Sequence, residues 1–260
     1  MIVDIHTHIF PDQIADRAVA KLRSISHLKN HTDGTAADLR RSMQEAGIRW
    51  SLVLPVATNP EKLVHMNDAA LALNGVDGLL SFGAVHPDAP DWKQELDRIA
   101  RGGLLGVKLH PAYQGVDLDD VRYLRILDRC GELGLTVLTH MGDDVGYPGV
   151  IRCTPEMGRS ALRQVGPVQV IFAHMGGWQN WDRVVDTLGD TGALFDTAAS
   201  LGASDWFDSP PQPWGAALLS SERFCGLVSA LGADRILFGT DSPWCSQKQA
   251  VDWLMMKGLK

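Results

Sequence analysis

DIHTH at residues 4–8 closes a short β-prone run that begins at Ile2. Side chains two positions apart on an extended strand point to the same side, so the imidazoles of His6 and His8 can face one metal ion. An isolated HxH pair also arises by chance. Its meaning therefore depends on whether other ligand residues follow strands elsewhere in the chain.

Seven further β-prone runs alternate with segments of helical periodicity. Several, such as LVLPV and VQVIFA, are almost continuously apolar, which is typical of parallel strands covered on both faces. The predicted strands are residues 2–5, 51–56, 80–85, 105–109, 136–139, 168–173, 194–196 and 235–239. Pro55 predicts that the second strand ends near it.

The predicted helices carry end signals. Gly47 and Gly134 are placed to end two of them, because glycine readily adopts the left-handed conformation that follows a helix. Thr154 followed by Pro155 predicts the start of another, with threonine as the N-cap. Eight strand–helix alternations predict an α/β protein with a (β/α)₈ TIM barrel of the metal-dependent hydrolase type, formed by residues 1–260 as one domain. An open doubly wound sheet is the alternative, but no GxGxxG follows the first strand.

Two connections look longer than a turn requires. One runs from residue 10 to about residue 35, and the other, residues 200–215, is rich in proline and tryptophan. Such loops are usually functional or disordered, and in a barrel both would rise on the catalytic face. The segment after the last strand is short, which leaves open a natural end or a missing closing helix.

Composition excludes several classes of protein. The formal net charge is −7 and no lysine- or arginine-rich run occurs, so a nucleic-acid partner is not expected. The N-terminus lacks the features of a signal peptide, and no apolar run approaches the roughly 20 residues that span a bilayer. None of the four cysteines forms a CxxC pair, as expected for reduced thiols. We therefore expect a cytoplasmic protein with no membrane partner.

Three more candidate ligands stand at the ends of predicted strands. His140 follows the fifth strand, His174 the sixth and Asp241 the eighth. Because the carboxyl ends of all barrel strands lie on one face, these side chains are expected to meet His6 and His8 there. Imidazoles and a carboxylate suit Zn²⁺, with manganese or iron as alternatives.

The ordered segments DIHTH, GVKLHP, LTHMG, FAHMGG and GTDSPW resemble the amidohydrolase superfamily, and most closely its amidohydrolase 2 branch. The resemblance runs from Asp4 to Trp244. It implies that His6, His8, His140 and Asp241 bind a divalent cation, with one ion favoured over two. It also implies that Asp241 relays a proton. His174 matches a histidine that polarises the substrate or moves a proton, or that binds a second ion.

Lys108 and His110 lie on the same face of the predicted fourth strand. Lys108 is open to three interpretations: a carbamylated bridge between two ions, a partner for a substrate carboxylate, or a partner for a protein acid. His110 is expected near the substrate or behind the ligands. Asp4 and Asp196 are candidate acceptors that would orient the ligand imidazoles.

Other polar and aromatic residues in predicted loops are less specific. Asp143 and Asp144 read as a solvated turn, and Arg152 as a surface residue or a carboxylate binder. Four tryptophans in these loops could form aromatic walls around a substrate or caps over the barrel mouth: Trp178, Trp206, Trp214 and Trp244.

The expected function is that of a metal-dependent hydrolase, in which a metal-bound water cleaves an amide, ester or lactone of a small organic acid. The alternative is a lyase, either a non-oxidative decarboxylase or a hydratase of a small carboxylic acid. A third hypothesis is a barrel that uses its ion for structure or binding only. The partner is a small molecule that carries a carboxylate, and self-association into a homo-oligomer remains open.

Overall fold

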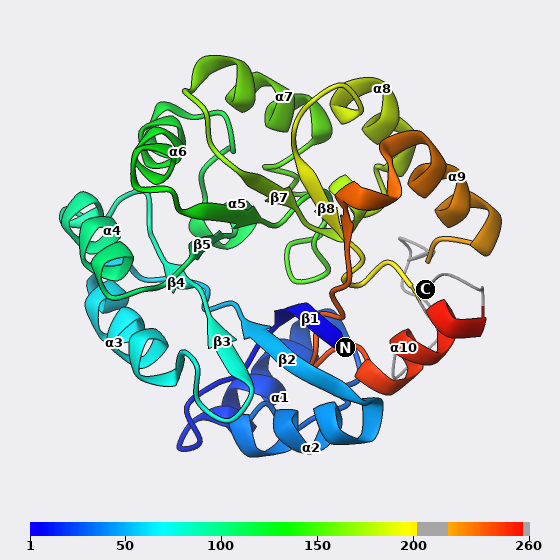
Figure 1. Cartoon of the computed structure of the whole chain (residues 1–260). Coiled ribbons are helices and arrows are strands. Elements are labelled where there is room, and N and C mark those ends of the chain that lie inside the picture. Colours follow the sequence, from blue (N-terminus) through cyan, green and yellow to red (C-terminus); the bar gives the residue numbers. More distant parts are fainter. Residues whose placement is uncertain (202–217, 257–260) are drawn as a thin grey trace.

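The computed structural model describes residues 1–201 and 218–256, and its strands form a ring enclosed by helices (Figure 1). All strand pairs in the described residues are parallel. The strands are β1 (Ile2–Thr7), β2 (Ile48–Val53), β3 (Leu79–Ser81), β4 (Gly83–Ala84), β5 (Gly106–Leu109), β6 (Thr136–Thr139), β7 (Val170–Phe172), β8 (Leu194–Asp196) and β9 (Ile236–Leu237).

Two sheets, in the orders β1-β2-β3 and β4-β5-β6-β7-β8-β9, join at both ends. Only Phe82 separates β3 from β4, and its N–H donates to the Val53 carbonyl at 3.1 Å, so β3 and β4 continue one barrel strand. On the other side, the Ile5 N–H donates to the Phe238 carbonyl at 2.9 Å. The ring is therefore closed, and the predicted (β/α)₈ barrel is confirmed.

Apolar side chains fill the inside of the ring. These side chains form one hydrophobic cluster to which strands around the barrel contribute. Its members include Leu52, Phe82, Leu138 and Ile171. An irregularity in β1 adds one residue relative to β2, between the pairs Asp4–Ser51 and Thr7–Val53. Such a bulge re-aims the side chains that follow it, here those that lead to the mouth of the barrel.

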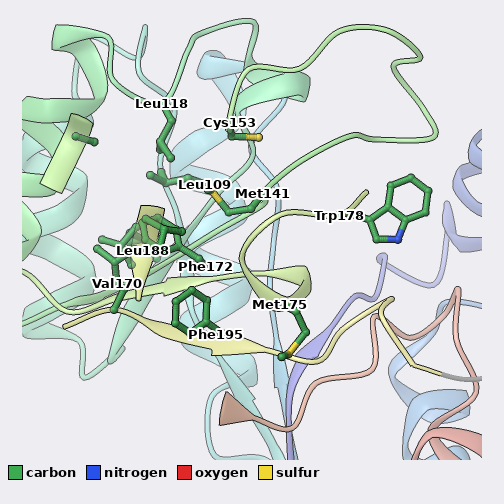
Figure 2. Close-up of a cluster of buried hydrophobic side chains, with 14 of the residues drawn as sticks. Leu109, Leu118, Met141, Cys153, Val170, Phe172, Met175, Trp178, Leu188 and Phe195 are labelled. Carbon is green, nitrogen blue, oxygen red and sulfur yellow. The ribbon is translucent and has the colours of Figure 1, made fainter. Parts of the chain in front are cut away.

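The helices form the outer layer of the barrel. They are α1 (Ala15–Ser26), α2 (Ala36–Ala46), α3 (Leu63–Leu73), α4 (Trp92–Arg101), α5 (Pro111–Gln114), α6 (Val121–Leu133), α7 (Pro155–Gln164), α8 (Val184–Leu188), α9 (Ser221–Leu231) and α10 (Gln247–Met256), with 3₁₀ turns at η1 (Pro60–Lys62), η2 (His174–Gly176), η3 (Trp181–Arg183) and η4 (Ala233–Arg235). The main core lies between strands and helices. Figure 2 shows part of it, where Phe172 and Phe195 of the sheet lie with Leu188 of α8.

The predicted helix ends are found in the structure. Gly47 and Gly134 follow α2 and α6 in the left-handed conformation, and their N–H groups donate to carbonyls of the last turn. Thr154 accepts a hydrogen bond from the Met157 N–H, and Pro155 is the first residue of α7. Gly47 and Gly134 thus lead from helices into the next strands, whereas Thr154 ends the loop between β6 and α7.

The structure bears on the two predicted long connections and on the segment after the last strand. The connection from residue 10 to residue 35 is not a plain loop, because it contains α1, whose Ala15 and Val19 are buried four residues apart. After the last strand, α10 packs against α2. Most of the predicted loop at residues 200–215, with Trp206 and Trp214, lies outside the described residues.

None of the described helices has the length and apolarity that crossing a membrane requires.

Candidate metal centre

Strand ends bring most of the predicted ligands to one place. His6 is in β1 and His8 follows it, while His140 follows β6, His174 follows β7 and Asp241 follows β9. All of them are buried or nearly so. Because β1 and β9 are neighbours at the closure of the ring, the candidate ligand residues that they carry lie next to each other. The Asp241 N–H donates to the His6 carbonyl at 2.8 Å.

His6, His8 and Asp241 form the tightest group. Asp241 Oδ1 lies 3.2 Å from His8 Nε2 and 3.5 Å from His6 Nε2. Three donor atoms at such separations can surround one ion, since zinc–nitrogen and zinc–oxygen bonds are about 2.0–2.2 Å long.

Hydrogen bonds on the other ring nitrogens fix the tautomers of these two histidines. His6 Nδ1 lies 2.8 Å from Asp196 Oδ2, and His8 Nδ1 lies 2.8 Å from the Leu54 carbonyl oxygen. A carbonyl or carboxylate oxygen can only accept, so Nδ1 carries the proton and the neutral ring has a free lone pair on Nε2. The lone pairs of both histidines therefore face Asp241, as metal binding requires.

His174 and His140 form a second pair beside this group. His174 Nδ1 donates to the Ala198 carbonyl at 2.9 Å, which leaves Nε2 to accept from His140 Nδ1 at 2.9 Å. The rings of His174 and His6 are 5.3 Å apart. His140 thus lies behind His174 and outside the compact group of His6, His8 and Asp241. Its Nε2 lies 3.1 Å from the Asp143 carbonyl oxygen.

The backbone at His174 is held in an uncommon conformation, with φ of 59°. Asp196 Oδ1 accepts the His174 N–H at 2.8 Å, and Trp181 Nε1 donates to the His174 carbonyl at 2.9 Å. Such a conformation costs about 1–3 kcal/mol and persists only when neighbours enforce it. Asp196 therefore fixes both the His6 ring and the position of His174.

Asp4, the other predicted acceptor, contacts no imidazole among the described residues. Its carboxylate accepts from the N–H of His6 and the N–H and hydroxyl of Thr240. Asp4 thus contacts the backbone that carries the ligands.

Lys108 lies inside the barrel next to the ligand group. Its Nζ is 3.1 Å from His6 Nε2, and among the described residues no carboxylate lies within ion-pair distance of it. Burial lowers the pKa of Lys108 from 10.5 to about 8, although Asp196 and Asp241 act to raise it. Of the three interpretations of this lysine, a simple ion pair with a protein acid is thus not seen in the described part of the chain.

His110 and Asp144 form a polar group on the far side of His140. The His110 ring stacks on His140 at 4.3 Å, and its Nε2 lies 3.5 Å from Asp144 Oδ2. Asp144 is not a solvated turn residue: its side chain is 13% exposed, and burial raises its pKa to about 6. The position of Asp144 depends on a loop fold that no local sequence pattern predicts.

The remaining loop residues are mostly structural. Arg152 pairs with Asp117 at 2.8 Å near the surface. Trp178 is buried and donates from Nε1 to the Ala199 carbonyl, and the partly buried Trp244 packs against the main core. Trp178 is therefore a buried core residue and not an open aromatic wall.

Electrostatics of the site suit a cation. Burial lowers the pKa of His6, His140 and His174, so these rings are neutral at pH 7 and available as ligands. Burial acts to raise the pKa of Asp241, but a hydrogen bond from His8 and the positive charge of His6 lower it overall when these rings carry a proton at Nε2. A bound cation would take the place of that proton and keep the carboxylate an anion. Neutral nitrogens around a buried anion form a donor set that fits a borderline divalent ion such as Zn²⁺.

Comparison with known proteins gives a family match and a shared fold. A family model described as Amidohydrolase matches residues 3–258. No curated protein matches the chain.

Several solved structures share the fold. An uncharacterised TIM-barrel protein, Bb4693 from Bordetella bronchiseptica, is 17% identical with a TM-score of 0.70, and the match covers 100% of this chain and 92% of that one. A dihydroxybenzoic acid decarboxylase from Polaromonas sp. JS666, with bound manganese, is 16% identical with a TM-score of 0.63, covering 98% and 91%. A structure described as probable 2-pyrone-4,6-dicarboxylic acid hydrolase from Acinetobacter baumannii is 14% identical with a TM-score of 0.62, covering 100% and 92%. At these identities the likeness concerns the fold alone.

Proposed function

Because the chain belongs to the amidohydrolase family, we propose that it is a metal-dependent hydrolase that cleaves an amide, ester or lactone bond of a small organic acid. Residues 1–260 are proposed to act as one domain. The observation that carries the proposal is the group of His6, His8 and Asp241, whose donor atoms converge while the other nitrogen of each imidazole is occupied.

One divalent ion, Zn²⁺ in preference to Mn²⁺, would be held by His6, His8, His140 and Asp241. To join them, the His140 ring would have to turn, because its Nδ1 faces His174 Nε2 at 2.9 Å and its Nε2 faces the Asp143 carbonyl oxygen at 3.1 Å. When bound, such an ion lowers the pKa of a coordinated water toward neutrality and polarises a substrate carbonyl.

Asp241 and His174 are the proposed acid–base residues. The Asp241 carboxylate accepts the proton of the attacking water and delivers it to the leaving group. His174 can donate to a developing oxyanion only from Nε2, because its Nδ1–H already donates to Ala198. Donation to an oxyanion would therefore need a second proton on His174, taken up at Nε2 from solvent or from the attacking water, because the neutral His140 ring cannot give up its one proton without becoming an anion.

Lys108 and His110 are proposed to bind the substrate's carboxylate. Lys108 Nζ is buried beside His6, where an ammonium group would attract a substrate anion toward the ligand group. His110 is buried, and its Nδ1 has no hydrogen-bond partner among the described residues. A second ion bridged by carbamylated Lys108 is the less favoured role.

A lyase is the second candidate function, either a non-oxidative decarboxylase or a hydratase. The same ligands and the same carboxylate-binding lysine would serve it, and several solved structures of this fold are described as decarboxylases. The two reactions differ in product: hydrolysis yields a new acid group without gas, and decarboxylation yields carbon dioxide.

The test uses the purified full-length protein, stripped of metal and reloaded with one equivalent of Zn²⁺ or Mn²⁺. Lactones, esters and amides of small dicarboxylic acids, and hydroxybenzoic acids, are assayed in parallel for carbon dioxide and for hydrolysis, followed by proton release for lactones and esters and by free amine for amides. We expect metal-dependent hydrolysis without carbon dioxide. Carbon dioxide release alone would replace the first proposal by the second, and failure to bind either metal would refute both.

A further inference from the structure

Asp4 is fully buried, and its carboxylate accepts four hydrogen bonds. Oδ1 accepts from the His6 N–H at 3.2 Å and the Thr240 N–H at 3.0 Å. Oδ2 accepts from the Thr240 hydroxyl at 2.6 Å and from Gln247 Nε2 at 2.8 Å. One side chain therefore contacts β1, the turn after β9, and α10.

The contacts with Thr240 extend to the ligands on both sides of the ring closure. The Thr240 hydroxyl oxygen also accepts from the Ser242 N–H at 3.2 Å, and the Ser242 carbonyl accepts from the His8 N–H at 2.6 Å. Asp241 lies between these two residues and adopts a positive φ of 71°. The turn that presents its carboxylate is thus fixed by hydrogen bonds that begin at Asp4.

We propose that Asp4 is a positioning residue that sets the separation between the His6 and His8 imidazoles and the Asp241 carboxylate by fixing the backbone of both ligand-bearing segments. The inference rests on the proposed metal centre. This role of Asp4 differs from the usual support of a metal-binding histidine, in which an acceptor binds the ring nitrogen that does not contact the ion. Asp196 supplies that support to His6.

The two donors to Asp4 Oδ2 offer a matched pair of variants. Thr240→Val keeps the size of the side chain but removes the hydroxyl that reaches the Asp241 turn. Gln247→Met removes a donor to the same oxygen, but this donor leads to α10 and to Ser51 rather than to a ligand. A purely structural carboxylate would make both variants less stable without changing ion affinity.

The measurement is Zn²⁺ affinity by competition with a chromogenic chelator, alongside the thermal midpoint of the metal-free proteins. We expect Thr240→Val to bind Zn²⁺ about tenfold more weakly, within the range typical of residues that support metal ligands. We expect Gln247→Met to lower the midpoint while leaving affinity within about twofold of wild type. Unchanged affinity in Thr240→Val, or equal losses in both variants, would overturn the proposal.

Asp4 itself supplies a conservative comparison. Asparagine retains one oxygen for the two N–H donors. Its amide N–H can donate to a reoriented Thr240 hydroxyl and to Gln247 Oε1, which has no partner among the described residues. We expect Asp4→Asn to retain affinity within about tenfold and Asp4→Ala to lose about a hundredfold. Equal affinities of the two variants would contradict the role, whereas a wild-type protein that binds no Zn²⁺ would refute the metal centre itself.

Discussion

Replacing Asp196 by asparagine tests how the protein keeps the His6 nitrogen free for an ion. Asp196 Oδ1 accepts from the N–H groups of His174 and Ala198 at 2.8 and 3.0 Å, and Oδ2 faces His6 Nδ1. Because those two backbone donors require an oxygen, the new amide must direct its N–H group at His6. The ring then shifts its proton to Nε2, the nitrogen that a metal needs.

The size of the effect follows from these contacts. Binding the ion would force His6 Nδ1–H against the amide N–H and leave a buried donor unpaired, which costs about 1–3 kcal/mol. Since about 1.4 kcal/mol corresponds to a tenfold change in an equilibrium constant, we expect Zn²⁺ affinity to fall by about 10- to 100-fold.

Two measurements check this prediction. Chelator competition gives the affinity, and ¹⁵N NMR of the metal-free protein reports which His6 nitrogen carries the proton. Asp190→Asn is the control, because Asp190 is a surface carboxylate paired with Arg159. An Asp196→Asn protein with wild-type affinity and an unprotonated Nε2 would refute the reasoning.

Three further predictions concern the chemistry, the core and the pH response. Asp241→Asn should abolish turnover while leaving the far-UV circular dichroism spectrum unchanged; full activity would exclude the proton relay. Phe195→Ala should lower the free energy of unfolding by about 3–5 kcal/mol in urea titrations, because the ring is fully buried, whereas Val121→Ala, at an exposed position, should change it by less than about 0.5 kcal/mol. Burial acts to raise the pKa of Glu95, but hydrogen bonds, chiefly from Arg98, lower it overall from 4.5. Its ionised form therefore stabilises the fold above pH 4.5, and that stability is lost as the pH falls through the folded pKa. Glu95→Gln should be less stable than wild type at pH 7, and this difference should shrink as the pH falls below 4.5; a gap that does not change with pH would contradict the prediction.

The barrel itself could be predicted because its signals are local and repeated. Apolar runs of strand length, and glycine or threonine–proline pairs at helix ends, depend on residues close in the chain. The predicted limits of the strands are less accurate, because the run at 80–85 is interrupted at Phe82. From the sequence, a loop is also expected where α1 forms. The sequence does carry a weak signal for α1, since Ala15 and Val19 have helical spacing, but its polar face obscured it.

The candidate site was predictable to the extent that it depends on strand ends. His6, His8 and Asp241 converge because the topology closes β1 against β9. Loop conformations and hydrogen-bond partners do not follow from strand order, so the burial of Asp144 was missed. For the same reason Asp4 is expected from the sequence to bind an imidazole, whereas it accepts from two backbone N–H groups and from the side chains of Thr240 and Gln247. The position of His140 behind His174 depends on side-chain rotation, which spacing does not determine.

The hydrogen bonds that close the ring also bear on how the chain folds and unfolds. The Asp4–Thr240 contact at this closure joins residues 236 positions apart, so it is among the slowest for an unfolded chain to find. The proposed cation-binding group forms only after that contact has formed, so the free energy of binding an ion would add to the free energy of folding. An ion held by His6, His8 and Asp241 would fasten the first strand to the last. We therefore expect chelation to speed unfolding more than it slows refolding.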